Sequence, residues 1–169
     1  MPDLILRKPV LEDGEQVCVL VKEMTEIDAE NCGGFPLKYT AMENFDDWMN
    51  AIEECRRRTF DDHQKFEIFF SFRGEELVGF IIIFTEPRKI CPFFDFGVVN
   101  YYIRPKFRRK GLGAEQLKLA LRIMPDLGFS DFLIMTKEDN CASRSLLENC
   151  GGKFKNKTVK DLVLYKFSV

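Results

Sequence analysis

Cations and glycines gather in the sequence stretch NYYIRPKFRRKGLGAEQL, between an apolar strand and the start of a helix. Arg108, Gly111 and Gly113 give this turn the spacing R-x-x-G-x-G. Arg109 and Lys110 add two positive charges, and the helix that follows directs its unpaired N–H groups and its positive dipole end at the turn. Backbone N–H groups and cations that converge in this way suit a phosphate group. The stretch therefore predicts an anion site.

The same stretch resembles the acetyl-CoA binding segment of the GNAT superfamily of N-acetyltransferases, with the pattern Tyr-x-Ile-Arg-Pro-x-x-Arg-x-x-Gly-x-Gly. A second block of that superfamily is matched at the expected distance by residues 139–143 and 147–152, which read DNCAS and LENCGG. This block is similar to a branch of bacterial predicted acetyltransferases in which N-x-x-S is followed by I/L-E-x-x-G-G. Two blocks in the right order extend the resemblance over essentially the whole chain.

The resemblance implies a GNAT-type α+β fold in one domain, residues 1–169, with a mostly antiparallel central sheet of about six to seven strands and about four flanking helices. Hydrophobic periodicity and turn residues predict the order β-α-α-β-β-β-α-β-α-β-β, which is the order that the resemblance implies. Strands are expected at residues 4–7, 66–72, 77–85, 94–104, 132–136, 153–159 and 162–167. Helices are expected from about residue 12 through Met24 and at 44–58, 111–124 and 142–150.

Composition excludes several classes of protein. The 169 residues and 46% hydrophobic content suit one domain with a substantial core. His63 is the only histidine, which argues against histidine triads and multi-histidine metal sites, so no metal is expected. A net charge of −2 and a pI near 5.6 argue against a nucleic-acid binder with a wholly basic surface.

Cysteine usage and the apolar stretches indicate a cytoplasmic protein without membrane association. The six cysteines form no C-x-x-C pair and are interpreted as free thiols. The N-terminal MPDLILRKPV lacks the layout of a signal peptide, and no stretch reaches the roughly 18 apolar residues that span a bilayer. Sequence leaves open whether the chain is a monomer or a homodimer that pairs through its final strands.

Acetyl-CoA, the co-substrate that the resemblance implies, requires a binding site for its pyrophosphate. Arg108 and Lys110 are expected to assist there, and Gly111 and Gly113 are expected to allow close approach of the backbone. The N–H groups expected to hold the pyrophosphate belong to Arg109, Lys110, Gly111, Leu112, Gly113 and Ala114.

The pantetheine arm of the co-substrate pairs, in this superfamily, with free backbone groups of the strand before the turn. Tyr102 and Ile103 occupy that place in this chain, although the strand's side chains could also simply fill a core. Asn140 aligns with the superfamily's asparagine that faces the arm, and capping the following helix is its alternative role. Ser143 is a further candidate for contact with the arm.

Acid and base residues depart from the common pattern of the superfamily. Its usual tyrosine acid falls at Leu147, and the usual glutamate base of lysine-modifying relatives falls at Gly97. Asp95, two residues earlier on the same face of a regular strand, is the first base candidate, with an exposed strand end as its alternative role. Tyr102 is the first hydroxyl candidate and Tyr101 its alternate. Cys141 near a helix start is a weaker, nucleophilic alternative.

The leading hypothesis is therefore direct transfer of an acetyl group to a primary amine in a small molecule or a peptide. The resemblance places the acceptor pocket among the first two helices, their loop and the final hairpin. Asp46 and Asp47 could attract a cationic amine or serve as helix caps. A non-catalytic acyl-CoA binding or sensing domain is the alternative. A Walker nucleotide site would need G-x-x-x-x-G-K-S/T, which is absent. Other residues expected in the acceptor pocket are Tyr39, Phe45 and Trp48.

Overall fold

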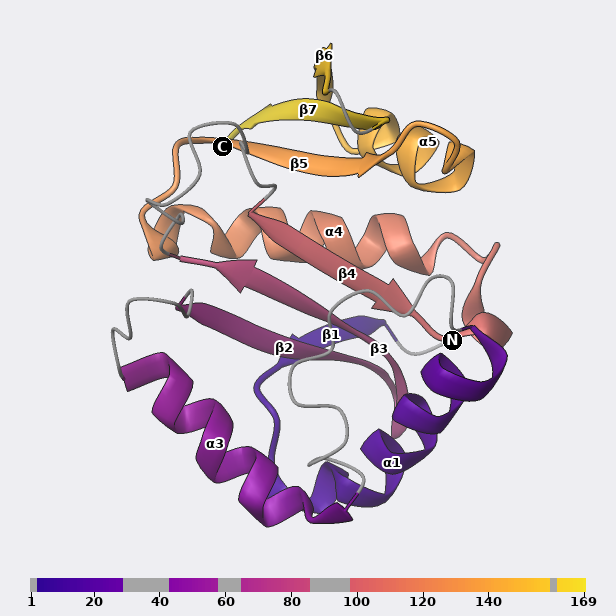
Figure 1. The fold of residues 1–169 in the computed structure, drawn as a ribbon, viewed down its shortest axis with the longest axis vertical. Coiled ribbons are helices and arrows are strands. Elements are labelled where there is room, and N and C mark those ends of the chain that lie inside the picture. The colour runs from indigo at the N-terminus through magenta and orange to yellow at the C-terminus, as the bar shows by residue number, and fades with distance from the viewer. Residues whose placement is uncertain (1–2, 29–42, 58–64, 86–97, 159–160) are drawn as a thin grey trace.

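The computed structural model describes residues 3–28, 43–57, 65–85, 98–158 and 161–169, which form two sheets and their covering helices (Figure 1). The strands are β1 (Leu4–Arg7), β2 (Phe66–Arg73), β3 (Glu76–Phe84), β4 (Val99–Ile103), β5 (Asp131–Lys137), β6 (Lys153–Lys157) and β7 (Leu162–Ser168). The helices are α1 (Gly14–Lys22), α3 (Phe45–Arg57), α4 (Leu112–Ile123) and α5 (Cys141–Asn149), and a π-helical turn, Glu23–Ile27, follows α1. The α+β class and the order of the elements are confirmed.

The first sheet is antiparallel throughout, in the order β1-β2-β3-β4. Its central hairpin turns at Gly74, whose φ of 61° suits glycine. The β2–β3 register shifts once, because Ser71 pairs with Gly79 while Phe72 pairs with Leu77, so Val78 is an extra residue on β3. This β-bulge changes the faces to which the following part of β3 directs its side chains.

The second sheet has the order β5-β7-β6, also antiparallel. Together the sheets contain the expected number of strands, but the expected single sheet is divided between β4 and β5. The long strand expected at residues 94–104 is described only from Val99, because residues 86–97 lie outside the described part. Gly151, with a φ of 94°, ends α5 in the left-handed conformation predicted for it.

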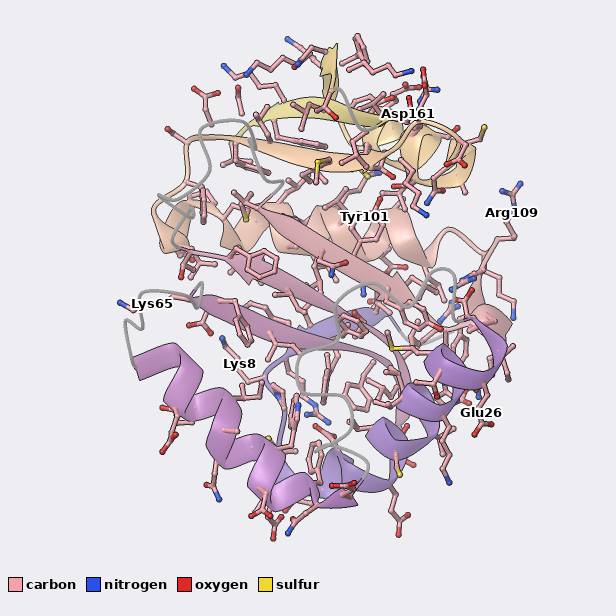
Figure 2. The ribbon with its side chains drawn as sticks, in the orientation of Figure 1. Lys8, Glu26, Lys65, Tyr101, Arg109 and Asp161 are labelled. Atoms are coloured by element: carbon pink, nitrogen blue, oxygen red, sulfur yellow. The ribbon has the colours of Figure 1, made fainter. Side chains whose placement is uncertain are left out.

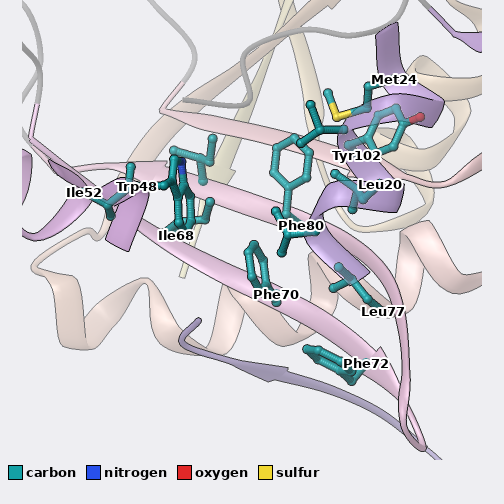
Figure 3. Packing of buried hydrophobic residues seen from close by; sticks show 13 residues of the cluster. Leu20, Met24, Trp48, Ile52, Ile68, Phe70, Phe72, Leu77, Phe80 and Tyr102 are labelled. Atoms are coloured by element: carbon teal, nitrogen blue, oxygen red, sulfur yellow. The ribbon is translucent and has the colours of Figure 1, made fainter. Parts of the chain in front are cut away.

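A core of aromatic and aliphatic side chains fills the space between the first sheet and the helices α1 and α3 (Figure 3). Trp48 of α3 is completely buried and stacks between Phe45, at a ring-centroid distance of 5.0 Å, and Phe70, at 6.1 Å. Tyr102 of β4 stacks on Phe80 at 5.6 Å in the same core. The apolar stripe of the helix at 44–58 is therefore core, as its spacing predicts.

A second core lies on the opposite face of the first sheet and joins it to α4, α5 and the second sheet. Leu117 of α4, Leu147 of α5 and Tyr165 of β7 are completely buried there. Within the described residues, no helix combines the length and the apolar character that crossing a membrane requires.

β4 and β5 run in the same direction and diverge, so that neighbouring edges of the two sheets separate (Figure 1). The N–H of Val98 donates to the carbonyl oxygen of Leu133 at 2.9 Å where the two strands begin side by side. Beyond that bond, β4 and β5 form no ladder in the part of the chain that is described. Among the described residues, the divergence leaves one edge of β4 without a paired strand at the end that leads into the glycine-rich turn.

Candidate active site

The glycine-rich turn begins at the end of β4 with a single 3₁₀ turn, Pro105–Phe107, and ends where α4 starts at Leu112. Two of its residues are left-handed: Gly111, with a φ of 79°, and Arg109, with a φ of 60°. A non-glycine residue in that conformation is strained by about 1–3 kcal/mol and occurs often at ligand sites. The sequence predicts the turn but does not predict the left-handed backbone conformation of Arg109.

Backbone N–H groups are free along this turn. Those of residues 109–113 donate to no other described residue, whereas the N–H groups of Ala114 and Glu115 both donate to the carbonyl oxygen of Gly111 at 3.1 Å. The free groups precede the positive end of α4, where an anion is stabilised. The turn thus has the unpaired donors that a phosphate group requires. Ala114, expected among those donors, has a partner within its own helix.

Gly111 and Gly113 serve different purposes. A Cβ at Gly111 would meet nothing within 4 Å, so its left-handed backbone is what calls for glycine. A Cβ at Gly113 would lie 2.7 Å from Cδ1 of Leu146, so Gly113 lets α4 pack closely against the end of this side chain of α5. Its other expected role, close approach of the backbone to the phosphate, stays a prediction.

The cations of the turn point in different directions. Arg108 forms an ion pair with Asp28, and its Nε donates to the carbonyl oxygen of Ile103 at 2.8 Å. Lys110 donates to the carbonyl oxygen of Lys106 at 2.9 Å. Arg109 is exposed and extends away from the body of the protein (Figure 2). Arg108 therefore ties the turn to the end of the first helical segment, whereas Arg109 and Lys110 are both exposed.

β4 directs alternate residues to its two edges. The N–H of Arg104 donates to the carbonyl oxygen of Val78 at 2.9 Å, and the N–H of Phe84 donates to that of Val98 at 2.8 Å. The register between these bonds is unbroken, so the backbone of Tyr102 also faces β3. Tyr101 and Ile103 consequently present their backbone groups at the open edge. The predicted pantetheine contact is thus geometrically available at Ile103, whereas the backbone of Tyr102 lies on the paired side.

The side chain of Tyr101 connects β4 with α5. Its hydroxyl oxygen lies 2.5 Å from Oγ of Ser143 on α5, and either hydroxyl can be the donor. Burial raises the pKa of Tyr101 to about 12, while the hydrogen bond with Ser143 acts in the opposite direction. The phenol is therefore neutral near pH 7 and keeps its proton.

Asn140 caps α5, since its side-chain oxygen accepts the N–H of Ser143 at 3.0 Å. This is the alternative role that the sequence offered for Asn140. The cap leaves its amide nitrogen as the group for a ligand contact, which stays a prediction.

Tyr102 occupies the other face of β4, where its side chain is 4% exposed and lies near Met24 (Figure 3). Its hydroxyl has no hydrogen-bond partner of normal geometry among the described residues. Burial raises the pKa of Tyr102, and the nearby carboxylate of Asp28 raises it further. Because its pKa is raised, the phenol of Tyr102 stays protonated near neutral pH and cannot act as a base there.

Other predicted residues lie elsewhere. Leu147 is fully buried in the core, and Cys141 is exposed at the start of α5. Asp46 and Asp47 are exposed in the first turn of α3, where the side chain of Asn44 is the cap that accepts both of their N–H groups, at 3.1 and 3.2 Å. Three predicted residues, Tyr39, Asp95 and Gly97, lie outside the described residues.

A buried ion pair beside the site is not evident from the sequence. Arg104 donates through Nε and a terminal nitrogen to the carboxylate of Glu23, both at 2.7 Å, and through its other terminal nitrogen to the carbonyl oxygen of Leu77. The hydrogen bond from Arg104 is the main reason that the pKa of Glu23 is lowered. The only hint in the sequence is a cation at the end of an apolar strand, before Pro105.

Solved structures with the same fold include several acetyltransferases. RimL, a ribosomal alpha-N-protein acetyltransferase in complex with coenzyme A, has a TM-score of 0.70 and 13% identity over 100% of this chain and 96% of that one. A chimera of the spermidine N-acetyltransferase SpeG from Vibrio cholerae and hSSAT has a TM-score of 0.67 and 17% identity over 98% and 95%. An aminoglycoside acetyltransferase in complex with coenzyme A has a TM-score of 0.67 and 12% identity over 98% and 95%.

Sequence comparison gives the family. No curated protein sequence matches the chain. The model of the Acetyltransferase (GNAT) family matches residues 28–152. This range includes the diverging strands β4 and β5, the glycine-rich turn and α5. This match spans most of the chain, and the chain therefore belongs to the GNAT family of N-acetyltransferases.

Proposed function

We propose that this protein transfers the acetyl group of acetyl-CoA directly to a primary amine, with both substrates bound at once. One observation carries the proposal: within the described residues, a turn with unpaired N–H groups follows β4, whose edge toward β5 has no paired strand. A phosphate seat followed by an open strand edge suits a ligand with a pyrophosphate and an extended amide-containing arm. Acetyl-CoA has both, and it supplies a thioester that an amine can attack.

The turn would bind the pyrophosphate through the N–H groups of residues 109–113, with Arg109 as the accessible cation. The arm would then follow the open edge of β4, meeting Ile103 first and Tyr101 next. Alternate residues are about 6.6 Å apart along a strand, which separates successive contacts with the arm. The backbone N–H of Tyr101, farther from the turn, would donate to the acyl carbonyl oxygen, where negative charge develops.

Tyr101 is our candidate for the proton donor to the departing thiolate. In the transfer, the amine nitrogen forms a bond to the acyl carbon, the bond from carbon to sulfur breaks, and the thiolate takes a proton. Ser143, which meets the Tyr101 hydroxyl, precedes Leu147 by one helical turn on the same face of α5. A tyrosine from β4 would thereby supply the hydroxyl that Leu147 lacks.

Tyr102, the first hydroxyl candidate from the sequence, is less suited to this role. Its hydroxyl belongs to the core near α1, whereas that of Tyr101 reaches α5. Asp95 stays the proposed base for the amine. The similar structures named for alpha-N-protein and spermidine N-acetylation favour an amine acceptor, in a protein or in a small molecule.

A non-catalytic acyl-CoA binding domain is the second candidate, and the burial of Leu147 in the core favours it. Such a domain would keep the phosphate seat and release no thiol with any acceptor. The two candidates agree on binding and differ on turnover, so both properties need to be measured on one preparation.

The test is a calorimetric titration with acetyl-CoA, followed by assays of thiol release with polyamines, aminoglycosides, amino acids and lysine peptides. We expect binding, together with release in one acceptor class. Gly111→Glu should weaken CoA binding by about 100-fold or more and leave the fold intact, because it adds a carboxylate beside the phosphate and strains a left-handed backbone. Unchanged affinity in that variant refutes the phosphate seat, and binding without release across the panel supports the non-catalytic domain.

A further inference from the structure

Gln116 is a completely buried amide on α4 that contacts the first sheet where β2, β3 and β4 lie side by side. Its Nε2 lies 2.6 Å from Oγ of Ser71 on β2, 3.1 Å from the carbonyl oxygen of Phe80 on β3 and 3.4 Å from that of Tyr102 on β4. One side chain therefore links the helix to three neighbouring strands. Its Oε1 has no hydrogen-bond partner among the described residues.

A buried amide with an unpaired oxygen destabilises a folded protein. Leu117 and Ala120, its buried neighbours on α4, are apolar, and an apolar side chain at residue 116 would avoid that cost. An apolar residue could not reproduce the hydrogen bonds that the amide nitrogen donates. Two of its three contacts are backbone carbonyl groups of β3 and β4, so Gln116 acts on the site through the backbone of these strands.

The carbonyl group of Tyr102 tilts out of the β3–β4 ladder toward α4. A Cβ at Gly79 would lie only 2.0 Å from this oxygen, so glycine is required there. Gly79 pairs with Ser71, whose hydroxyl contacts Gln116, and the missing Cβ would therefore point to the α4 face of the sheet. The extra residue Val78 in β3 precedes Gly79 and belongs to the same distortion.

The tilt of this carbonyl fixes the direction of the Ile103 N–H, because the two groups belong to one planar trans peptide and point in opposite directions. The N–H of Ile103 is thus directed to the open edge of β4. The carbonyl oxygen of Ile103 is also held, by Nε of Arg108 at 2.8 Å. Among the described residues this N–H has no acceptor, and side chains hold the carbonyl groups on either side of it.

We propose that Gln116 is a positioning residue, which orients the Ile103 N–H as a donor to an amide carbonyl of the pantetheine arm. The inference rests on the proposed function, since it assigns a contact to the co-substrate at the same site. Gln116 does not touch the co-substrate. By holding the Tyr102–Ile103 peptide, it determines how far the arm advances along β4 and where the acyl group comes to lie.

The test compares two probes, coenzyme A and 3′-phosphoadenosine 5′-diphosphate, which keeps the pyrophosphate and lacks the arm. Gln116→Met should weaken coenzyme A binding about two- to tenfold, the range for one hydrogen bond, and leave the affinity of the shorter probe within about twofold. A merely structural role would weaken both probes alike. Ser71→Ala is the matched control, because it removes another partner of the same amide, and it should leave the ratio of affinities unchanged.

Equal losses for both probes, or no loss for either, overturn the inference. Gln116→Leu repeats the comparison if the methionine variant does not fold. In the wild-type protein, the amide proton of Ile103 should shift on binding coenzyme A and stay unchanged with the shorter probe, and the lack of that difference also refutes the contact. If the wild type binds neither probe, the proposed function fails as well; if it binds both with no effect of Gln116, only this inference fails.

Discussion

The two faces of β4 carry adjacent tyrosines in contrasting surroundings. Tyr101 reaches across to α5 and meets the hydroxyl of Ser143, beside the diverging strands. Tyr102 is packed into the core near Met24, with Asp28 and Arg108 close by. Arg104, on the same side as Tyr102, is committed to a buried ion pair with Glu23. Both faces of β4 pack into a core, but only the hydroxyl of Tyr101 reaches α5, beside the point where β4 and β5 diverge.

Arg104→Met should produce the largest effect on stability, because it leaves the partly buried carboxylate of Glu23 without its partner. We expect the free energy of unfolding to fall by about 3 kcal/mol, as when one member of a buried ion pair is removed. Chemical denaturation measures it. Lys106→Met, which breaks an exposed ion pair with Glu76, is the control and should change stability by less than about 1 kcal/mol. Similar losses in the two variants contradict a structural role specific to Arg104.

Tyr101→Phe should lower turnover about tenfold to 100-fold with little change in the KM for acetyl-CoA, because it removes the proposed proton donor and keeps the ring. The assay is thiol release with the acceptor that the panel identifies. Ser143→Ala should have a smaller effect, since it removes the partner of the phenol and not the phenol itself. Full activity of Tyr101→Phe excludes this tyrosine as the acid.

Tyr102→Phe tests the opposite face and should change turnover by less than about twofold. Its hydroxyl has no partner of normal geometry in the described part of the chain, so stability should change by no more than about 1 kcal/mol in either direction. Kinetic assays and denaturation on the same preparation measure both quantities. A large loss of turnover with intact stability would reverse the assignment of the two tyrosines.

The pH dependence of stability gives the smallest expected effect. The pKa of Tyr101 is raised by burial to about 12, above the value of about 10 for an unfolded tyrosine. The folded state therefore retains this proton after the unfolded state has lost it, so the contribution is complete below pH 10 and is lost as the pH rises toward 12. Denaturation at pH 9 and pH 11 should show a smaller decrease for Tyr101→Phe than for the wild type. Equal decreases contradict the shift.

The sequence predicted the glycine-rich turn well because its conformation is local. Gly111 needs a left-handed backbone, and the following helix supplies unpaired N–H groups whatever the rest of the chain does. The order of strands and helices follows from periodicity for the same reason. The packing of Gly113 against Leu146 could not be predicted, because Leu146 is distant in sequence and close only in the fold. The role of Gly113 at the phosphate stays a prediction.

Contacts between distant segments account for what the sequence could not predict. Asp28 and Arg108 are 80 residues apart, and Arg104 and Glu23 are 81 apart. The choice between Tyr101 and Tyr102 depends on the register of β4 against β3, which no spacing within β4 reveals. The three contacts of Gln116 depend on a bulge at Val78 and on the packing of α4 against the sheet.

Residue-resolved amide hydrogen exchange, with and without coenzyme A, tests most directly the claim that the co-substrate binds along one edge of β4. The amides of Tyr101 and Ile103 should exchange faster than those of Tyr102 and Arg104 in the free protein, and coenzyme A should slow their exchange strongly. The amides of residues 109–113 should be protected as well. Equal exchange of odd and even residues in β4, or no added protection at Tyr101 and Ile103, would contradict the account.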